Sequence, residues 1–267
     1  MLQQSKGCRN PEALVAFLNV GQGDATYIQD TTGKSILIDT GPKDSQVVTR
    51  IQEVTGCNKV SIDSLVLTHP DSDHIGEAEK MITKGLVKQV VHNGFMDMDQ
   101  PDESPTENRL ETTTIPRRTV LAGDILSLEN IQLQVIYPME EPYLTKPKKG
   151  EVDDNIYSLS MKITSGEHSF IVTGDAYVLE EKKMIARYKE MLDVDVLKLG
   201  HHGSKTSTSQ EFLTVTSPDE VVISAGKDNS YKHPSEVVLS RVYTQQRKKP
   251  LQIRETFTEG NVVYLLE

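Results

Sequence analysis

Short apolar runs bounded by turn-forming residues recur along the whole chain. Runs of four to seven apolar residues that end at Gly, Asp or Thr are typical of short β-strands. Two of them flank the turn at 31–34 and form a hairpin. We expect strands at 13–20, 25–29, 35–39, 64–68, 87–92, 119–121, 131–137, 158–163, 169–173, 194–199, 220–224, 251–257 and 262–265.

Segments with helical spacing of apolar residues lie between these runs. In 44–55 the apolar positions recur three and four residues apart, and Gly56 follows where a helix would end. Further helices are expected at 75–84, at 178–192, near 209–215 and after Pro234. Helices interspersed with strands in both halves of the chain predict an α/β protein with two sheets flanked by helices.

One segment departs from this pattern. Residues from 95 to about 118 are acidic and proline-rich and show hardly any apolar periodicity, which indicates a long polar insertion or a flap. A chain of 267 residues can form one large domain or two small ones. We expect a single domain over 1–267 that carries this polar insertion at about 95–118.

The amino-acid composition and net charge exclude some functions for this chain. With 29 Lys and Arg against 39 Asp and Glu, the net charge is −10, which argues against a protein that coats nucleic acid. The charge does not exclude an enzyme that binds a phosphodiester locally through bound metal cations. Two cysteines are too few for a disulfide scaffold, and no apolar run reaches about 18 residues. We therefore expect a soluble protein of the reducing cytoplasm with no membrane partner.

The densest group of metal-binding side chains is the run from 69 to 74, His-Pro-Asp-Ser-Asp-His. It directly follows an apolar strand and precedes a helix, so a loop can direct His69, Asp71, Asp73 and His74 towards one or two neighbouring cations. The alternative is a polar turn in which Asp73 caps the next helix. Four ligand-type residues in six positions favour the metal site.

Two further strands deliver ligand-type residues in the same manner. The apolar run 170–173 leads through Gly174 to Asp175, and the run 194–199 leads to His201 and His202. Taken singly, each is better explained as a turn or a polar loop. Three strand ends that all carry potential ligands predict one composite site.

These residues resemble the metallo-β-lactamase-fold hydrolases, and most closely the hydrolase domain of the competence protein ComEC. The matching stretches follow the family's order from about 13 to 240. They are 20–24, 37–41, 68–74, 122–124, 136–138, 155–159, 173–175, 201–204, 224–229 and 233–234. The resemblance implies an αββα sandwich with the site at one edge, and hydrolysis by a metal-activated water.

The resemblance also implies a ligand set for two divalent metal ions. It assigns His69 and Asp71 to one metal, Asp175 to a bridging position, and Asp73, His74 and one of His201 or His202 to the other metal. Better-known members of the superfamily have His where Asp71 stands, so zinc or manganese are both expected. The usual third His of the first site has no counterpart here, and Asn155 stands where the ComEC-like branch also has an asparagine. The first metal is therefore expected to be weakly held or to arrive with the substrate.

Other residues are expected to act around the metals. His201 and His202 are adjacent, so a strand-like backbone would turn them in opposite directions; we assign His202 to the metal and His201 to proton donation or substrate contact. Asp73, or the set of bridging carboxylates, would hold and polarise the water. His233 either binds a phosphoryl oxygen or simply starts a helix beside Pro234.

Outside the ligands, Asp39 is expected to orient a ligand histidine, and Asp24 either does likewise or caps a turn. The basic segments 146–149 and 247–249 can follow a phosphate backbone, although solvated loops are the commoner explanation.

We expect a metal-dependent phosphodiesterase or nuclease whose substrate is a phosphodiester, either DNA or a nucleotide. One alternative is the same fold acting on a phosphorylcholine ester, a lactone or a thioester. Another is a non-catalytic binding or toxin–antitoxin partner on a decayed metal site, against which Asp73, His74 and Asp175 argue. Oligomeric state and biological pathway are not encoded in these patterns.

Overall fold

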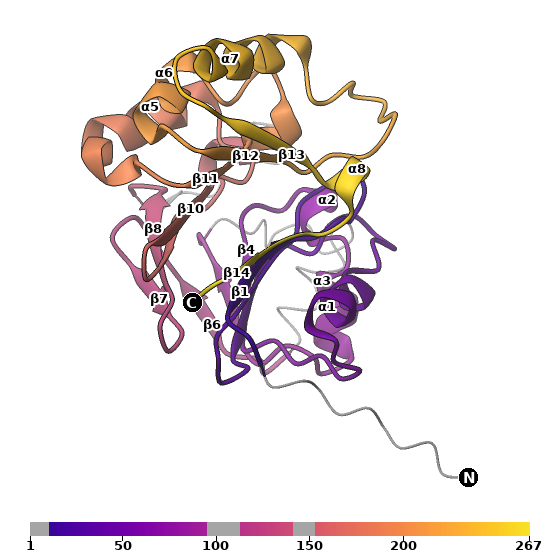
Figure 1. Ribbon diagram of the computed structural model, residues 1–267. Coiled ribbons are helices and arrows are strands. Elements are labelled where there is room, and N and C mark those ends of the chain that lie inside the picture. Colours follow the sequence, from indigo (N-terminus) through magenta and orange to yellow (C-terminus); the bar gives the residue numbers. More distant parts are fainter. Residues whose placement is uncertain (1–10, 95–112, 141–152) are drawn as a thin grey trace.

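Two seven-stranded sheets packed face to face form the centre of the molecule (Figure 1). The computed structural model describes residues 11–94, 113–140 and 153–267. The first sheet has the order β14-β1-β2-β3-β4-β5-β6. Its strands are β1 (Leu14–Phe17), β2 (Thr26–Gln29), β3 (Ser35–Ile38), β4 (Ser64–Leu67), β5 (Val90–His92), β6 (Arg117–Thr119) and β14 (Val262–Leu265).

The second sheet has the order β13-β12-β11-β10-β9-β8-β7. In each sheet, antiparallel strands pass into a parallel set, namely β3 to β6 in the first sheet and β10 to β13 in the second. The strands of the second sheet are β7 (Ile125–Ser127), β8 (Gln132–Tyr137), β9 (Ser160–Ser165), β10 (His168–Val172), β11 (Val196–Lys198), β12 (Glu220–Ile223) and β13 (Gln252–Glu255).

Apolar side chains cover both faces of the central strands, which is why these strands read as continuous apolar runs. In β1, Val15 and Phe17 pack in the core between the sheets, where Phe170 of the second sheet meets them. The alternate residues Leu14 and Ala16 pack in a separate core on the outer face of the first sheet. Successive side chains of a strand point to opposite faces, so one short run serves two cores.

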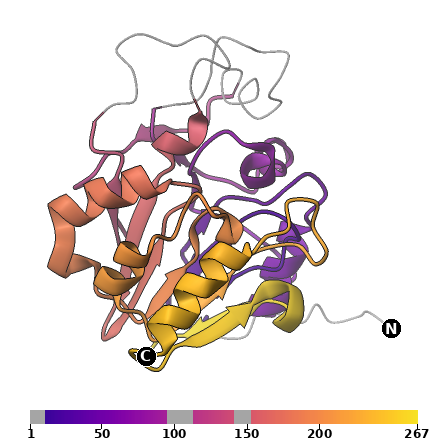
Figure 2. The same ribbon diagram turned by 90° about the horizontal axis from the view of Figure 1, so that it is seen from above.

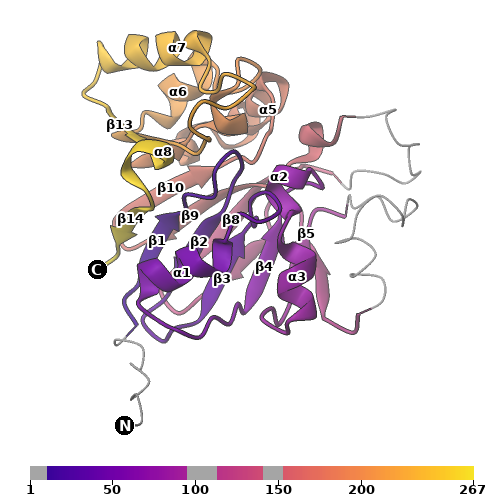
Figure 3. The ribbon, with the colours of Figure 1, turned by 90° about the vertical axis from the view of Figure 1, so that its right-hand side faces the viewer.

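Helices cover the outer face of each sheet (Figures 2 and 3). The helices α1 (Val47–Thr55), α2 (Ser72–Ile75) and α3 (Ala78–Thr83) pack on the first sheet. The helices α5 (Val178–Tyr188), α6 (Gln210–Thr216) and α7 (Glu236–Gln246) pack on the second. The remaining helical elements are four residues long each. They are the α-helix α8 (Thr256–Glu259) and the 3₁₀ turns η1 (Asp154–Tyr157), η2 (Lys189–Leu192) and η3 (Gly200–Gly203).

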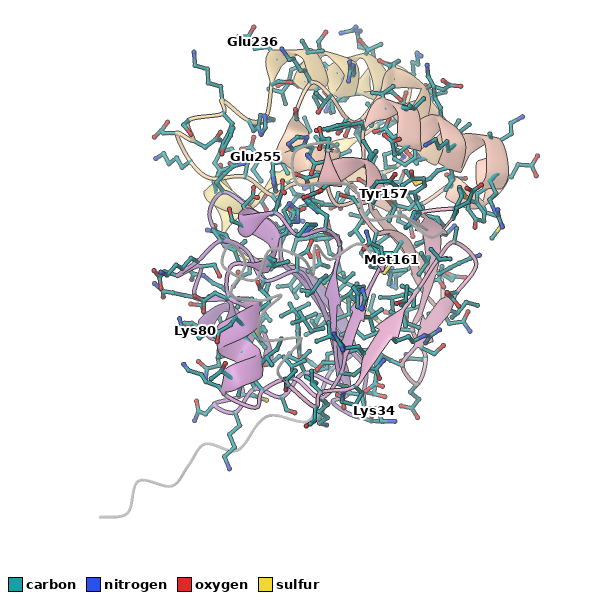
Figure 4. The ribbon with its side chains drawn as sticks, turned by 180° about the vertical axis from the view of Figure 1, so that it is seen from behind. Lys34, Lys80, Tyr157, Met161, Glu236 and Glu255 are labelled. Carbon is teal, nitrogen blue, oxygen red and sulfur yellow. The ribbon has the colours of Figure 1, made fainter. Side chains whose placement is uncertain are left out.

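The resulting layers, helices, sheet, sheet, helices, confirm the αββα sandwich predicted from the sequence. Figure 4 shows the contrast between the interior and the surface: Met161 lies inside, whereas Lys80 and Glu236 lie on helices at the outside. Met161 is fully buried between the sheets.

Several predicted elements have different boundaries in the structure. The helix predicted at 75–84 is two short helices that meet at Gly76, where the chain passes so close to the 42–43 segment that a Cβ would lie 2.2 Å from the Lys43 nitrogen. The helix predicted at 178–192 changes to a 3₁₀ turn after Tyr188. The strand predicted at 251–257 ends at Glu255, and α8 follows.

The polar insertion is described only at its end. Its residues 95–112, and the basic segment 146–149, lie outside the described residues. Arg117–Thr119 forms the edge strand β6, so the insertion ends earlier than predicted and the strand expected at 119–121 begins two residues sooner.

Within the described ranges, no helix has both the length and the apolar composition that a membrane span needs.

Candidate metal centre

The predicted ligands converge where several strands of both sheets end. Asp39 follows β3, His69 follows β4, Asp175 follows β10, and His202 follows β11. Within each sheet these strands are parallel neighbours, so their carboxyl ends lie at one edge. The two edges meet where Gly174 packs beside Thr68, since a Cβ on Gly174 would lie 3.2 Å from the Cβ of Thr68.

Asp175 lies at the centre of this group and is buried. Its Oδ1 lies 3.2 Å from Nε2 of His74. Its Oδ2 lies 3.6 Å from Nε2 of His202, 3.5 Å from Nε2 of His201 and 4.0 Å from Nε2 of His69. One carboxylate therefore faces four imidazoles from both halves of the chain.

Hydrogen bonds to the outer nitrogens orient two of these imidazoles. Nδ1 of His74 lies 2.7 Å from Oδ2 of Asp39, and Nδ1 of His202 lies 3.0 Å from the carbonyl oxygen of Ser224. Both oxygens only accept, so each Nδ1 carries a proton and donates it. Nε2 of each ring therefore faces the cluster, where a bound metal would replace its proton, as in metal-binding histidines.

The inner atoms of the cluster have no hydrogen-bond partner. They are buried and comprise Nε2 of His69, His74 and His202 together with Oδ1 of Asp24 and Asp175. Potential ligand atoms of Asp24, His74, Asp175 and His202 all lie within 4.8 Å of one another. Buried polar atoms without partners are costly, and imidazole nitrogens with carboxylate oxygens suit zinc or manganese. This donor set therefore fits a divalent metal.

The ionisation of the cluster follows from its mixture of charges. Burial alone would raise the pKa of Asp175, but His74 and His202 hold that pKa well below its usual range. Burial alone would lower the pKa of His202, but Asp175 and Asp24 raise the pKa to about 9. The pKa of His74 is likewise raised well above its usual value by Asp175 and Asp39, against the effect of burial. In the absence of metal, protons on these rings balance the carboxylates.

Asp24 occupies a more central position than sequence reasoning gave it. Its Oδ1 lies 3.2 Å from Nδ1 of His202, and its Oδ2 pairs with Nζ of Lys198, which is buried on β11. Burial would raise the pKa of Asp24, but Lys198 and His202 hold it below its usual range. Lys198 was missed by sequence reasoning, although a lysine inside an apolar strand is itself an unusual signal.

The loop that carries Asp24 is held against the loop that carries Asp73. The Asp24 amide donates to the carbonyl oxygen of Asp73 at 3.2 Å. A Cβ on Gly23 would lie 2.3 Å from that same oxygen, so only glycine permits this approach. Oδ2 of Asp73 lies 3.2 Å from Nε2 of His202 and is partly exposed, which places it at the open side of the cluster.

The argument that His201 and His202 must point in opposite directions is wrong. Both residues have left-handed backbones, with φ of 49° and 54°, inside the turn η3 and not in a strand. Both rings consequently reach Asp175. They differ in burial, because His202 is 1% exposed whereas the side chain of His201 is 21% exposed and its Nδ1 lies 3.1 Å from Oγ1 of Thr206.

His69 and Asp71 form the outer part of the site. Oδ2 of Asp71 lies 3.6 Å from Nε2 of the buried His69, and the Asp71 side chain is 45% exposed. Asn155 is buried on η1, and its Nδ2 donates to the hydroxyl of Tyr177 at 3.0 Å. Its Oδ1 has no partner, and the ring of Tyr177 stacks on His201 with centroids 5.8 Å apart. Asn155 is thus linked to the site by Tyr177. Tyr177 was not predicted from the sequence.

His233 is brought to the same site. Its ring stacks on His202 with centroids 6.4 Å apart, and its Nδ1 is buried without a partner. His233 also directly precedes Pro234 and the α7 cap Ser235. It therefore lies both at the site, as a phosphate-binding role requires, and at the start of a helix.

The basic run 247–249 lies away from this site. It follows the C-terminal end of α7, an 11-residue helix about 16 Å long. The N-terminal end of α7 adjoins Gly203 and the site, so the basic run lies at the opposite end of the helix. Lys249 pairs with Asp219 at 2.7 Å.

Comparison with known proteins agrees with this architecture. The family model of the metallo-beta-lactamase superfamily matches residues 18–227. ComE operon protein 3 of Bacillus subtilis (strain 168) is 30% identical over 274 residues, covering 96% of this chain and 33% of that protein. Recombination protein 2 of Haemophilus influenzae is 30% identical over 241 residues, covering 89% of this chain and 27% of that protein. The chain spans about a third of the length of these relatives or less.

A solved structure shows the same fold at low sequence identity. The metallo-beta-lactamase fold protein YhfI of Bacillus subtilis superposes with a TM-score of 0.59 at 12% identity, covering 95% of this chain and 99% of that one. Together with the family match, this likeness confirms the resemblance found in the sequence.

Proposed function

Because the chain belongs to the metallo-beta-lactamase superfamily and brings a buried carboxylate and imidazole cluster to its sheet edge, we propose that it is a metal-dependent phosphodiesterase that cleaves nucleic acid. The observation that carries the proposal is the set of buried nitrogen and oxygen atoms that face one another without hydrogen bonds. Hydrolysis of another ester on the same fold is the main competitor, and the experiment below distinguishes the two.

Two divalent ions, zinc or manganese, are the proposed cofactors. Asp73, His74, His202 and Asp24 would hold one ion, His69 and Asp71 the other, and Asp175 would bridge. When bound, such ions activate water near neutral pH and stabilise the charge that develops on phosphoryl oxygens. The four carboxylates of Asp24, Asp71, Asp73 and Asp175 equal the charge of two divalent ions.

The residues of the open side have separate roles in this proposal. Asp73 is partly exposed beside His202, and its carboxylate would accept a hydrogen bond from the attacking water and orient it. His201 is half-buried, and burial lowers its pKa although Asp175 opposes the shift. When its ring is protonated, His201 would donate that proton to the leaving oxygen. His233 offers a ring nitrogen to a phosphoryl oxygen.

The name of one relative favours a nucleic-acid substrate. This relative is named a recombination protein, and recombination acts on DNA. The net charge of −10 requires that the grip on such a substrate be local.

The test is a substrate comparison on chelated and metal-reconstituted protein. Single-stranded DNA, duplex DNA, RNA, a cyclic nucleotide and a small chromogenic diester are compared with a phosphorylcholine ester, a lactone and a thioester. We expect metal-dependent cleavage of at least one nucleic acid. Cleavage of the small diester alone would reassign the chain to small-molecule phosphodiesters, and cleavage of a carboxylic ester alone would contradict the proposal.

A further inference from the structure

An aromatic residue stands at the solvent end of a row of rings that leads into the metal centre. Tyr231 is 68% exposed and stacks on His233, with centroids 5.7 Å apart and an interplanar angle of 26°. His233 in turn stacks on His202 at 6.4 Å and 28°. Among the large apolar side chains in the described ranges, Tyr231 is the most exposed.

The loop that carries this ring is fixed by its own hydrogen bonds. Asn229 donates from Nδ2 to the carbonyl oxygens of Gly226 and His233, at 2.8 and 2.6 Å, and its Oδ1 accepts from the His233 amide at 3.0 Å. The loop, which joins β12 to α7 (Figure 1), is also anchored at both ends. The Gly226 amide donates to Gln22, and the Ser235 amide donates to the Gly203 carbonyl oxygen.

A single exposed aromatic residue is common on protein surfaces and usually needs no explanation. Two features set Tyr231 apart. Its ring is held by a stack and a rigid loop, so binding a flat ligand costs little conformational entropy. Lys227 and Lys232 are exposed on the same loop and give it cationic charge, with Asp228 as the opposing charge.

We propose that Tyr231 is the stacking platform for an unpaired nucleobase next to the phosphodiester that enters the metal centre. The inference rests on the proposed function and names its substrate class, single-stranded nucleic acid. Every base offers a π-face to an aromatic ring, so such a platform is tolerant of sequence. Bases in a duplex are already stacked and paired, and therefore the platform favours single strands.

The test measures binding separately from cleavage. Metal-reconstituted protein is titrated against a labelled phosphorothioate DNA strand of about 12 nucleotides, within the length that one single-strand site covers. The same titration uses a fully abasic strand of equal length. Variants Tyr231→Ala and Tyr231→Phe are compared with Tyr243→Ala, which removes another exposed tyrosine, from the middle of α7.

We expect Tyr231→Ala to weaken binding of the intact strand by about 5- to 150-fold, the range known for stacked bases. Tyr231→Phe and Tyr243→Ala should bind as the parent does. The abasic strand should bind weakly to the parent and no more weakly to Tyr231→Ala. Equal binding of the intact strand by parent and Tyr231→Ala would overturn the proposal, as would equal losses on both strands.

Cleavage of an ordinary phosphodiester strand is then measured on the same preparations. If the parent cleaves the strand but the binding pattern is absent, the platform is wrong and the proposed function stands. If the binding pattern is present but the parent cleaves no nucleic acid, the proposed function fails while the platform stands.

Discussion

At the residue scale, the site depends on one buried carboxylate shared by rings from both halves of the chain. Asp175 faces His74 from the first sheet and His202 from the second. Each ring is aligned by an acceptor behind it, Asp39 in one case and the Ser224 carbonyl in the other.

The sequence predicted Asp175, because an apolar strand that ends in Gly-Asp has a recognisable pattern. It could not predict the Lys198–Asp24 pair, whose members are 174 residues apart.

Replacing Asp175 with Asn should abolish hydrolysis and lower metal affinity by at least about tenfold. The isosteric amide keeps the packing but removes the negative charge that faces the imidazoles. Metal content after dialysis and the rate of hydrolysis are the measurements. Asp219→Asn, which alters an exposed carboxylate paired with Lys249, is the control and should change neither. Full metal content and activity in Asp175→Asn would exclude a bridging role.

The raised pKa of His202 predicts opposite pH dependences with and without metal. Its pKa of about 9 in the folded protein lies above the unfolded value near 6.5. The stabilising proton is therefore fully bound below about pH 6.5 and is lost as the pH rises through 9. We expect the unfolding free energy of metal-free protein to fall by about 3 kcal/mol across that window.

Metal-saturated protein should become more stable over the same range, because metals compete with protons for Nε2. Urea titrations at several pH values, with chelator or with manganese, measure both trends. A metal-free protein whose stability rises from pH 6.5 to 9 would contradict the charge balance described for the cluster.

At the element scale, tight turns after the strands place the ligands. The strands, most helices and the layer order follow from apolar spacing, and these were predictable. The turns were not, because their backbone conformations depend on distant contacts. η3 puts His201 and His202 in left-handed conformations that no alternation rule anticipates. Gly76 likewise permits the close approach of the 42–43 segment, which no local pattern announces.

Gly203→Ala tests this role of the turns. Gly203 has a φ of +84°, and a Cβ there would lie 2.7 Å from the Cβ of Pro234. Both the strained backbone and the clash would displace η3 from the loop that carries His233. We expect a loss of about 2 to 4 kcal/mol in unfolding free energy, together with weaker metal binding.

Gly56→Ala separates the two effects. Gly56 has a left-handed backbone, with φ of 66° and ψ of 14°, and nothing lies within 4 Å of the added Cβ, so this variant carries the backbone strain alone. It should cost about 1 to 2 kcal/mol and leave metal binding unchanged. If both variants lost equal stability and both kept their metal, close packing of η3 would not position the site.

At the scale of the whole molecule, a net charge of −10 limits how nucleic acid can be held. If the grip comes from the metal centre, Tyr231 and the two lysines of its loop, few phosphates are neutralised. Two lysine contacts to a single strand give a slope of log affinity against log salt of about −1.4. We expect the measured slope to be no steeper than about −2.

Fluorescence anisotropy of a labelled strand across a salt series provides this slope. Lys227→Gln combined with Lys232→Gln should flatten it, and Arg247→Gln combined with Lys248→Gln, at the far end of α7, should not. A steep slope that survives the first pair would contradict this assignment and would point to other basic residues, such as Lys146, Lys148 and Lys149.

The central claim, that the buried cluster is a metal centre that hydrolyses phosphodiesters, is tested most directly by reconstitution. Chelated protein is titrated with zinc, manganese or calcium while bound metal and cleavage of single-stranded DNA are measured on the same sample. We expect activity to be lost on chelation and to return in proportion to bound zinc or manganese. Calcium should restore little, because it prefers more oxygen ligands than this cluster offers. Undiminished cleavage by metal-free protein, or equal rescue by calcium, would contradict the account.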